Sequence, residues 1–289
     1  MKFSLIITTR GRTHELKRLF QSLKDQTQQD FEVVLSDQNI DDRLLPLIKE
    51  FGSELKFIHL KSSGGASRGR NQGIVKASGD IFGFPDDDCA YPAPLLEQVA
   101  DFFQTNVQYG YLSCRSVADD GNDSVTRYAK RASAINKLTI HSQCVEFGIF
   151  IRRAQLGDIR FDEKMGVGAS TPWHSDEGPD IILRLEAAGI RGYYDPRFAI
   201  WHAQPVTSYD AKDIDRTYRY ACGNGYFYRK HQYSESFFMY QMGRTFCGLL
   251  LALVTLQMGK ARLYLARLRG RWRGWQSSPV REQTLSQPS

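Results

Sequence analysis

The chain lacks the features that mark several large classes of protein. Its five cysteines are odd in number and widely separated, and none stands in a C-x-x-C or Cys/His arrangement. A disulfide framework or a zinc site is therefore not expected, whereas free thiols in a reducing compartment are. The N-terminal stretch MKFSLIITTRGR contains too short an apolar run for a signal peptide. We therefore expect a cytoplasmic protein.

Two nucleotide-binding signatures are missing as well. A dinucleotide-dependent oxidoreductase should carry G-x-G-x-x-G directly after its first strand, but the turn here reads TTRGRTHE and contains one glycine, Gly11. A P-loop hydrolase should carry G-x-x-x-x-G-K-[ST], which the chain does not contain. Both classes are thereby disfavoured.

Strands and helices alternate through about the first ninety residues. Apolar runs predict buried strands over residues 3–7, 31–35, 55–60 and 81–84. Apolar residues at helical spacing predict helices over residues 14–23 and 44–51, and a third helix that opens in the glycine-rich loop and runs through Ile74 and Ala77. This alternation predicts an α/β protein with a doubly wound, Rossmann-like, mostly parallel sheet flanked by helices.

Polar side chains gather where the predicted strands end. Thr8–Arg10, Asp37, the glycine-rich loop SSGGASRGRN and Asp86–Asp88 each follow a strand. Ligands of such sheets bind outside the carboxyl ends of the strands, so these four groups should meet at one edge.

The three consecutive aspartates Asp86, Asp87 and Asp88 indicate a positive partner. Adjacent carboxylates suit Mg²⁺ or Mn²⁺, which takes oxygen ligands and shares them with phosphate. Such an ion can bridge to a diphosphate and stabilise it as a leaving group. The alternative is a solvated, aspartate-rich turn before Pro92.

The chain resembles the inverting glycosyltransferases of family 2, which have the GT-A fold. The resemblance covers residues 3–202, and it is carried in family order by SLIITTRGR, VVLSDQN, GASRGRNQGI, FPDDDC, DEGPDIILR and YYDPRFAIWH. It implies that the nucleotide-sugar donor is bound by Thr8, Thr9, Arg10, Asp37, Gly65, Arg68, Asn71, Asp86 and Asp87. It also implies a DxD metal site in which Asp88 is the direct ligand, Asp86 lies nearer the ribose or the ion, and His202 completes the site.

The catalytic base is expected in the second half of the chain. An inverting transfer needs a carboxylate that deprotonates the acceptor hydroxyl, and the family usually shows paired acids before a helix with an arginine. Counting back from Arg184, the pair falls on Glu177 and on Gly178, which is a departure from the family pattern. We assign the base to Glu177, with Asp176 second. The alternative is that these acids only complement the helix dipole.

Two further residues are assigned to the acceptor side. Trp173 ends the loop GVGASTPW and offers an aromatic face to a sugar, although a plain surface loop is the other interpretation. Asp180 is assigned either to this side or to the helix as a structural acid. His202 also has two interpretations, a metal ligand or a packed core histidine.

The excess positive charge lies in the C-terminal part of the chain. Residues 260–289 contain seven of the 38 Lys and Arg residues and one of the 32 acids, so the rest of the chain is neutral. The apolar stretch from Phe246 is about a dozen residues, short of the length needed to span a bilayer. Basic residues mixed with leucine and tryptophan then follow, which is typical of an element in an anionic membrane interface. The alternatives are a buried core helix and, for the basic tail, nucleic-acid binding, which we do not expect.

These observations predict a GT-A catalytic domain over residues 1–205, with a nucleotide-binding half (1–92) and an acceptor half (93–205). A helical, membrane-associating region (206–275) and a disordered tail (276–289) follow. The expected function is transfer of a sugar from a UDP- or dTDP-sugar to a glycan or lipid-linked acceptor in surface polysaccharide synthesis, at the cytoplasmic face of the inner membrane. A nucleotidyltransferase and an inactive sugar-nucleotide-binding relative are the alternatives.

Overall fold

The computed structural model describes residues 1–204 and 207–277 and divides into two compact units. The first holds Met1–Ser170 and Glu177–Val206, and the second holds Thr171–Asp176 and Thr207–Ser289. The predicted boundary at 205/206 falls on undescribed residues, and so does most of the predicted disordered tail.

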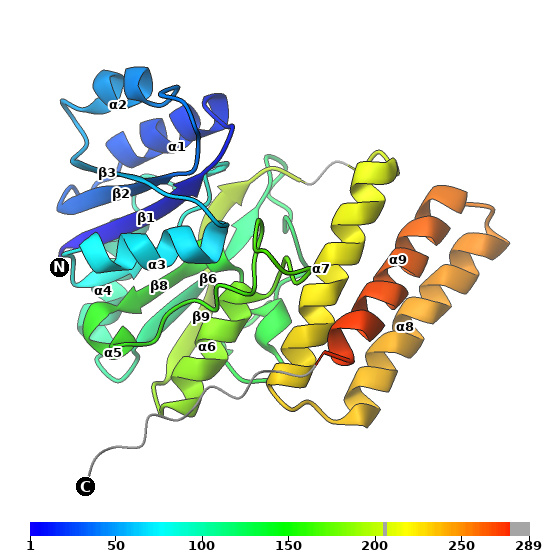
Figure 1. The fold of residues 1–289 in the computed structure, drawn as a ribbon. Coiled ribbons are helices and arrows are strands. Elements are labelled where there is room, and N and C mark those ends of the chain that lie inside the picture. The colour runs from blue at the N-terminus through cyan, green and yellow to red at the C-terminus, as the bar shows by residue number, and fades with distance from the viewer. Residues whose placement is uncertain (205–206, 278–289) are drawn as a thin grey trace, which may run out of the picture. The chain divides into compact units, whose positions relative to one another are not determined.

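The first unit is built on one mixed sheet (Figure 1). Its order is β3-β2-β1-β4-β8-β6-β9-β5, with β7 paired to β9. The strands are β1 (Phe3–Thr9), β2 (Phe31–Asp37), β3 (Phe57–Lys61), β4 (Ile81–Gly83), β5 (Cys89–Ala90), β6 (Tyr111–Val117), β7 (Ser133–Ala134), β8 (Ile149–Arg152) and β9 (Gly192–His202).

The first four strands are mutually parallel, as predicted. From β8 onward the sheet is mixed, because β8 runs antiparallel to both β4 and β6, while β6 and β9 are parallel. The predicted α/β sheet flanked by helices is therefore present, with the parallel part confined to the N-terminal half and to the β6–β9 pair.

Helices cover the two faces of the sheet. Phe20 of one helix packs on Phe57, whose neighbour in register is Val33. On the opposite face, the backbone of another helix at Gly73 approaches Ile6 and Val34. These helices are α1 (His14–Lys24) and α3 (Ala66–Lys76); the unit also contains α2 (Leu45–Phe51), α4 (Leu95–Thr105), α5 (Arg153–Leu156), α6 (Glu177–Ala187) and the one-turn helices η1 (Ile140–Ser142) and η2 (Glu146–Gly148).

Strand β1 is longer than the apolar run predicts. Thr8 and Thr9, expected in a loop, continue the ladder opposite Ser36 and Asp37 of β2. Both strands therefore end together, and their last side chains lie at the same edge of the sheet.

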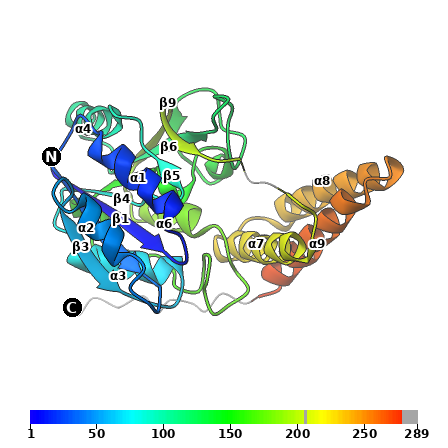
Figure 2. The same cartoon turned by 90° about the horizontal axis from the view of Figure 1, so that it is seen from above.

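The second unit contains three long helices, α7 (Ala211–Lys230), α8 (Glu235–Val254) and α9 (Met258–Trp275). Helix α9 lies between α7 and α8 (Figures 1 and 2). Phe238 of α8 stacks on Trp275 of α9, with ring centroids 4.3 Å apart. The predicted C-terminal helical extension is thus confirmed. By length and composition, α8 is also apolar enough to cross a membrane, which the shorter count from Phe246 does not indicate.

A buried carboxylate ties three segments of the first unit together. Glu32 of β2 accepts hydrogen bonds from Lys2 Nζ at 2.5 Å, Ser4 Oγ at 2.6 Å and the backbone N–H of Ser78 at 2.7 Å. Burial alone would raise the pKa of Glu32, but these hydrogen bonds outweigh it and lower the pKa to about 2. The ionised form is therefore the one that stabilises the fold.

Replacing Glu32 by glutamine should lower the free energy of unfolding at pH 7, by up to about 3 kcal/mol, because the ionised form is lost. The folded-state pKa lies below the ordinary value of 4.5, so this stabilisation is complete above pH 4.5 and disappears as the pH falls towards 2. Urea denaturation at several pH values measures it. Glu50, half-exposed and paired with Lys17, provides the control, since E50Q should change stability by less than about 0.5 kcal/mol. A difference for E32Q that is as large at pH 3 as at pH 7 would contradict the assignment.

Candidate functional site

The three aspartates lie at the carboxyl edge of the sheet and each has a different partner. Asp86 forms a bridge with Thr8 of β1 and accepts from Arg70 Nη2 at 2.8 Å. Asp87, which is buried, accepts from Thr9 Oγ1 at 2.7 Å and from Arg12 Nη1 at 2.6 Å. Asp88 accepts from the same Arg12 nitrogen at 2.6 Å. The triplet is therefore an organised cluster and not a solvated turn.

Arg70 is the buried centre of this cluster. Its side chain is 2% exposed and bridges Asp86 to Glu177, whose Oε1 lies 3.1 Å from Nη1. Glu146 of η2 also acts electrostatically on this guanidinium. Arg70 thus joins the β4 loop of the nucleotide half to α6 and η2 of the other half.

The cluster contains more acidic than basic side chains. Its members are Asp86, Asp87, Asp88, Glu146 and Glu177 against Arg12, Arg70 and His202. Withdrawal from water, together with the neighbouring acids, raises the pKa of Asp86 to about 6 and of Glu146 to about 8, although Arg70 opposes both shifts. Such an excess is what a bound cation would relieve.

The predicted metal ligands Asp88 and His202 are adjacent. His202 Nε2 lies 3.4 Å from Asp88 Oδ1, and its ring stacks on Phe147. Burial would raise the pKa of Asp88, but His202 and Arg12 lower it, so this carboxylate is kept ionised. Within residues 1–204 and 207–277 no ready-made cluster of three His, Cys, Asp or Glu ligands occurs. A divalent cation fits if Asp88 and His202 supply two ligands and a diphosphate supplies the others.

Asp37, predicted to bind the nucleotide-sugar donor, ends β2 and is fully buried. Its carboxylate accepts hydrogen bonds from the Asn39 backbone N–H at 2.9 Å and lies 3.0 Å from both His59 Nε2 and Lys61 Nζ. These hydrogen bonds outweigh burial and lower the pKa of Asp37. Thr8 and Thr9 end the adjacent strand, and Arg10 is exposed just beyond it.

The glycine-rich loop approaches the second half of the first unit. Gly65 has a φ of +95°, its carbonyl accepts from Gln38 Nε2 at 2.8 Å, and a Cβ there would lie 2.6 Å from the carbonyl carbon of Gly168. Asn71 exchanges two hydrogen bonds with the backbone of Phe161, at 2.9 and 2.8 Å. Arg68 is exposed and lies 4.0 Å from Glu163. Nucleotide contacts by these three residues stay predictions.

The residues assigned to the acceptor side and to the base are divided between the two units. Asp180 is fully buried and accepts from Arg184 Nε at 3.0 Å, an (i, i+4) pair within α6. Trp173 and Asp176 belong to the second unit, where the Trp173 ring stacks on Tyr226 at 3.8 Å. Glu177 is the predicted base that joins the aspartate cluster.

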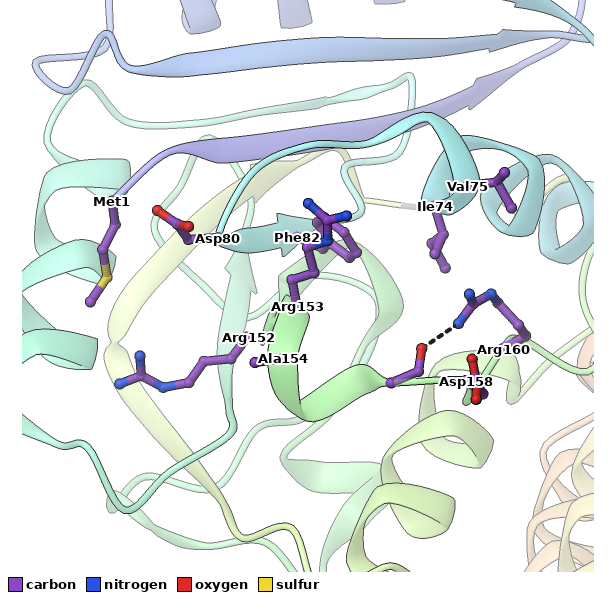
Figure 3. A pocket seen from close by; sticks show the side chains of 11 residues that line it. Met1, Ile74, Val75, Asp80, Phe82, Arg152, Arg153, Ala154, Asp158 and Arg160 are labelled. Carbon is purple, nitrogen blue, oxygen red and sulfur yellow. Dashed lines mark hydrogen bonds between the residues drawn. The ribbon is translucent and has the colours of Figure 1, made fainter.

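A cavity of 940 Å³ lies at the opposite edge of the sheet (Figure 3). Its lining includes Asp80 and Phe82, at the amino end of β4, while the aspartates follow the carboxyl end of that strand. Arg153 and Arg160 in the lining donate to the backbone carbonyls of Ser78 and Gly157. This cavity is therefore separate from the aspartate cluster.

Sequence reasoning missed Arg12, Arg70 and Glu146. A signal for Arg70 was available, because it stands three residues after Ser67 and four before Ile74, on one buried face of α3. An arginine on a buried face requires acidic partners. Arg12 follows β1 at the same edge as the aspartates. Glu146 gave no signal, since it lies in a single turn without periodicity.

Replacing Arg70 by methionine should lower the free energy of unfolding by about 3–5 kcal/mol, because Asp86 and Glu177 lose their shared cation in a buried site. Guanidinium denaturation measures the change. The matched variant is R68M on the same helix, where the side chain is exposed and a change within about 0.5 kcal/mol is expected. Equal effects of the two variants would contradict the central role of Arg70.

Comparisons with known proteins agree with this architecture. The family model described as Glycosyl transferase family 2 matches residues 4–166, more than half of the chain. An uncharacterized glycosyltransferase of Haemophilus influenzae is 27% identical over 183 residues, which cover 63% of this chain and 61% of the relative. The uncharacterized glycosyltransferase YfnE of Bacillus subtilis is 35% identical over 94 residues, 30% of this chain and 23% of the relative. The match thus spans less than two thirds of either relative.

Solved structures show the same fold. A structure of S. aureus TarS in complex with UDP-GlcNAc superposes with a TM-score of 0.58 at 17% identity, covering 94% of this chain and 91% of that one. A second TarS structure gives a TM-score of 0.59 at 20% identity over 82% of this chain and 44% of that one. The predicted GT-A fold with C-terminal helices is confirmed, and the chain belongs to glycosyl transferase family 2.

Proposed function

We propose that the protein is a metal-dependent inverting glycosyltransferase that uses a nucleoside-diphosphate sugar. The observation that carries the proposal is the aspartate cluster at the carboxyl edge of the sheet, where β1 and β2 end together and the segment after β4 reaches Thr8 at Asp86. Ligands of open α/β sheets bind at this edge. Membership of family 2 supports the same reaction class.

The donor is proposed to be a UDP- or dTDP-sugar. A TarS structure of the same fold was solved with UDP-GlcNAc, which supports a uridine nucleotide. In this chain the nucleoside would lie against the ends of β1 and β2, near Thr8, Thr9, Arg10 and Asp37. Its diphosphate would face Asp86 and Asp88.

Mg²⁺ or Mn²⁺ would be held by Asp88 and His202, with Asp86 nearby. When bound, such an ion neutralises the diphosphate and stabilises it as a leaving group. Asp87, paired with Arg12 and Thr9, holds the turn that presents Asp88. A carboxylate of the cluster takes the proton of the acceptor hydroxyl as the hydroxyl oxygen attacks the anomeric carbon. The sequence assigns this role to Glu177.

A thermal-shift panel of UDP, GDP, dTDP and CMP, each with Mn²⁺ and with EDTA, tests the donor site. One diphosphate should stabilise the protein in Mn²⁺ by about 2.7 kcal/mol at a hundredfold excess over its Kd. D88N should fold normally and lose the Mn²⁺-dependent part of the shift. The control is D101N, an exposed acid on α4, which should respond like the wild type. If folded wild-type protein responds to none of the four nucleotides, the donor assignment is wrong.

The second unit is proposed to contact the membrane. Its apolar tip, defined as the exposed apolar side chains around the α8–α9 turn, comprises Leu250, Leu251, Leu253, Val254, Leu256 and Met258, with exposures of 41–82%. Five exposed cations of α9 follow it: Lys260, Arg262, Arg267, Arg269 and Arg273. Arg271 is not part of the exposed basic surface that the sequence predicts, because its side chain turns inward and donates to Asn224 Oδ1 at 2.9 Å.

An apolar tip followed by cations favours an interface of anionic lipid. Helix α8 packs along α9, with Gly248 against the Tyr264 ring, and it carries Arg244, so we propose a monotopic contact and not a single span. A lipid-linked or glycan acceptor at the cytoplasmic face of the inner membrane, in surface polysaccharide synthesis, would agree with this contact.

Flotation with vesicles tests the membrane contact. The protein should bind phosphatidylcholine vesicles that contain about one third phosphatidylglycerol, and bind pure phosphatidylcholine weakly. L251S/V254S/L256S should reduce binding at least about tenfold, because the apolar area that enters the interface is lost. I40S/V107S removes two exposed apolar side chains of the first unit, with exposures of 105% and 78%, and is the control. Equal binding by the two variants would contradict the proposed surface.

A further inference from the structure

The family usually places a second acid where this chain has Gly178. A Cβ built on Gly178 would lie 2.8 Å from the Cβ, 2.9 Å from the Cα and 3.0 Å from the backbone nitrogen of Glu146. The one-turn helix η2 therefore occupies the space that a side chain at position 178 would need. In place of that side chain stands another acid, from a segment 32 residues earlier in the chain.

Hydrogen bonds from two strand-side residues reach η2 and the segment that leads into it. Ser113 Oγ of β6 donates to the carbonyl of Gln143 at 2.6 Å, and Tyr91 Oη donates to the carbonyl of Phe147 at 3.2 Å. Strand β8 begins directly after η2 and pairs with both β4 and β6. Glu146 thus lies on a one-turn helix that leads directly into β8, between β4 and β6.

The two acids beside Arg70 differ in how accessible their carboxylates are. Glu177 is 2% exposed and paired with Arg70, and a Cβ on Gly166 would lie only 2.9 Å from its carboxyl carbon, so it is enclosed on that side. Glu146 is half-buried, and among the described residues no other residue's side chain is seen to donate a hydrogen bond to the Glu146 carboxylate. A base must reach the proton that it removes, and Glu146 is the acid that retains this access.

We propose that Glu146 is the proton acceptor of the sugar transfer, replacing the missing acid at position 178, and that Glu177 is a positioning residue that fixes Arg70. This inference rests on the proposed function. In the step, the ionised form of Glu146, which prevails above its pKa of about 8, takes the proton of the acceptor hydroxyl while the hydroxyl oxygen forms its bond to the anomeric carbon. The bond from that carbon to the phosphate oxygen breaks, and its electron pair leaves with the nucleoside diphosphate. The proton then passes from Glu146 to water.

The test compares E146Q, E146D and E177Q with the wild type. Nucleoside diphosphate release is measured from UDP-GlcNAc, UDP-glucose, dTDP-glucose and GDP-mannose in Mn²⁺, with water as the acceptor, and nucleotide binding is measured by thermal shift. E146Q should keep the nucleotide shift and lose at least about a hundredfold in release. E146D keeps a carboxylate and should retain more activity than E146Q. E177Q should lower the Tm without nucleotide, because Arg70 loses a partner, and E50Q should match the wild type.

The outcomes separate the two proposals. Release by E146Q at the wild-type rate, with wild-type protein active, would overturn the role of Glu146 and leave the glycosyltransferase proposal standing. A hundredfold loss in E177Q with its Tm unchanged would also overturn it, in favour of Glu177 as the base. Wild-type protein that neither binds a nucleotide nor releases a diphosphate would contradict the proposed function itself. Wild-type binding without release from any donor would contradict a catalytic role for Glu146.

Discussion

The site depends on one buried cation. Arg70 lies on the sheet-facing side of α3, and its guanidinium contacts acids that come from a strand end and from the first turn of α6. A buried arginine is tolerated only when its charge is balanced, and buried acids are tolerated only beside such a charge. The cluster therefore forms as a whole, and it fixes the carboxyl end of β4 relative to the start of α6.

Much of the fold follows from local patterns. The apolar runs that precede Thr8, Asp37 and Asp86 predict buried strands, and the topology of a parallel sheet then brings the polar ends together. The antiparallel insertion of β8 could not be predicted in this way, because the order of strands is set by long-range pairing. The extra length of β1 has the same origin, since threonines are polar in sequence and their ladder partners are known only in the fold.

The candidate site divides along similar lines. Aspartates at a strand end are visible in sequence, whereas the acid that lies against Gly178 is not. Its position depends on a one-turn helix that Tyr91 bonds directly, and on the preceding residues, which Ser113 bonds at Gln143. Asp180 has the spacing of a functional acid but forms an (i, i+4) pair with Arg184. In the second unit the basic stretch of α9 was predictable, while the inward turn of Arg271 depends on the neighbouring helices.

The hydrogen bonds between α3 and residues 161–167 have a consequence for how such enzymes diversify. Asn71, Ser67 and the backbone of Ala66 bind Phe161, Met165 and Val167 in turn. The family match ends at residue 166, within this seam. A recombination between relatives just after Val167 would exchange α6, β9 and all later residues. Both partners of every hydrogen bond in this seam would stay together in the N-terminal fragment. New downstream partners can thus be acquired without rebuilding the nucleotide half, provided that the incoming α6 brings an acid to Arg70 and the incoming β9 brings a histidine to Asp88.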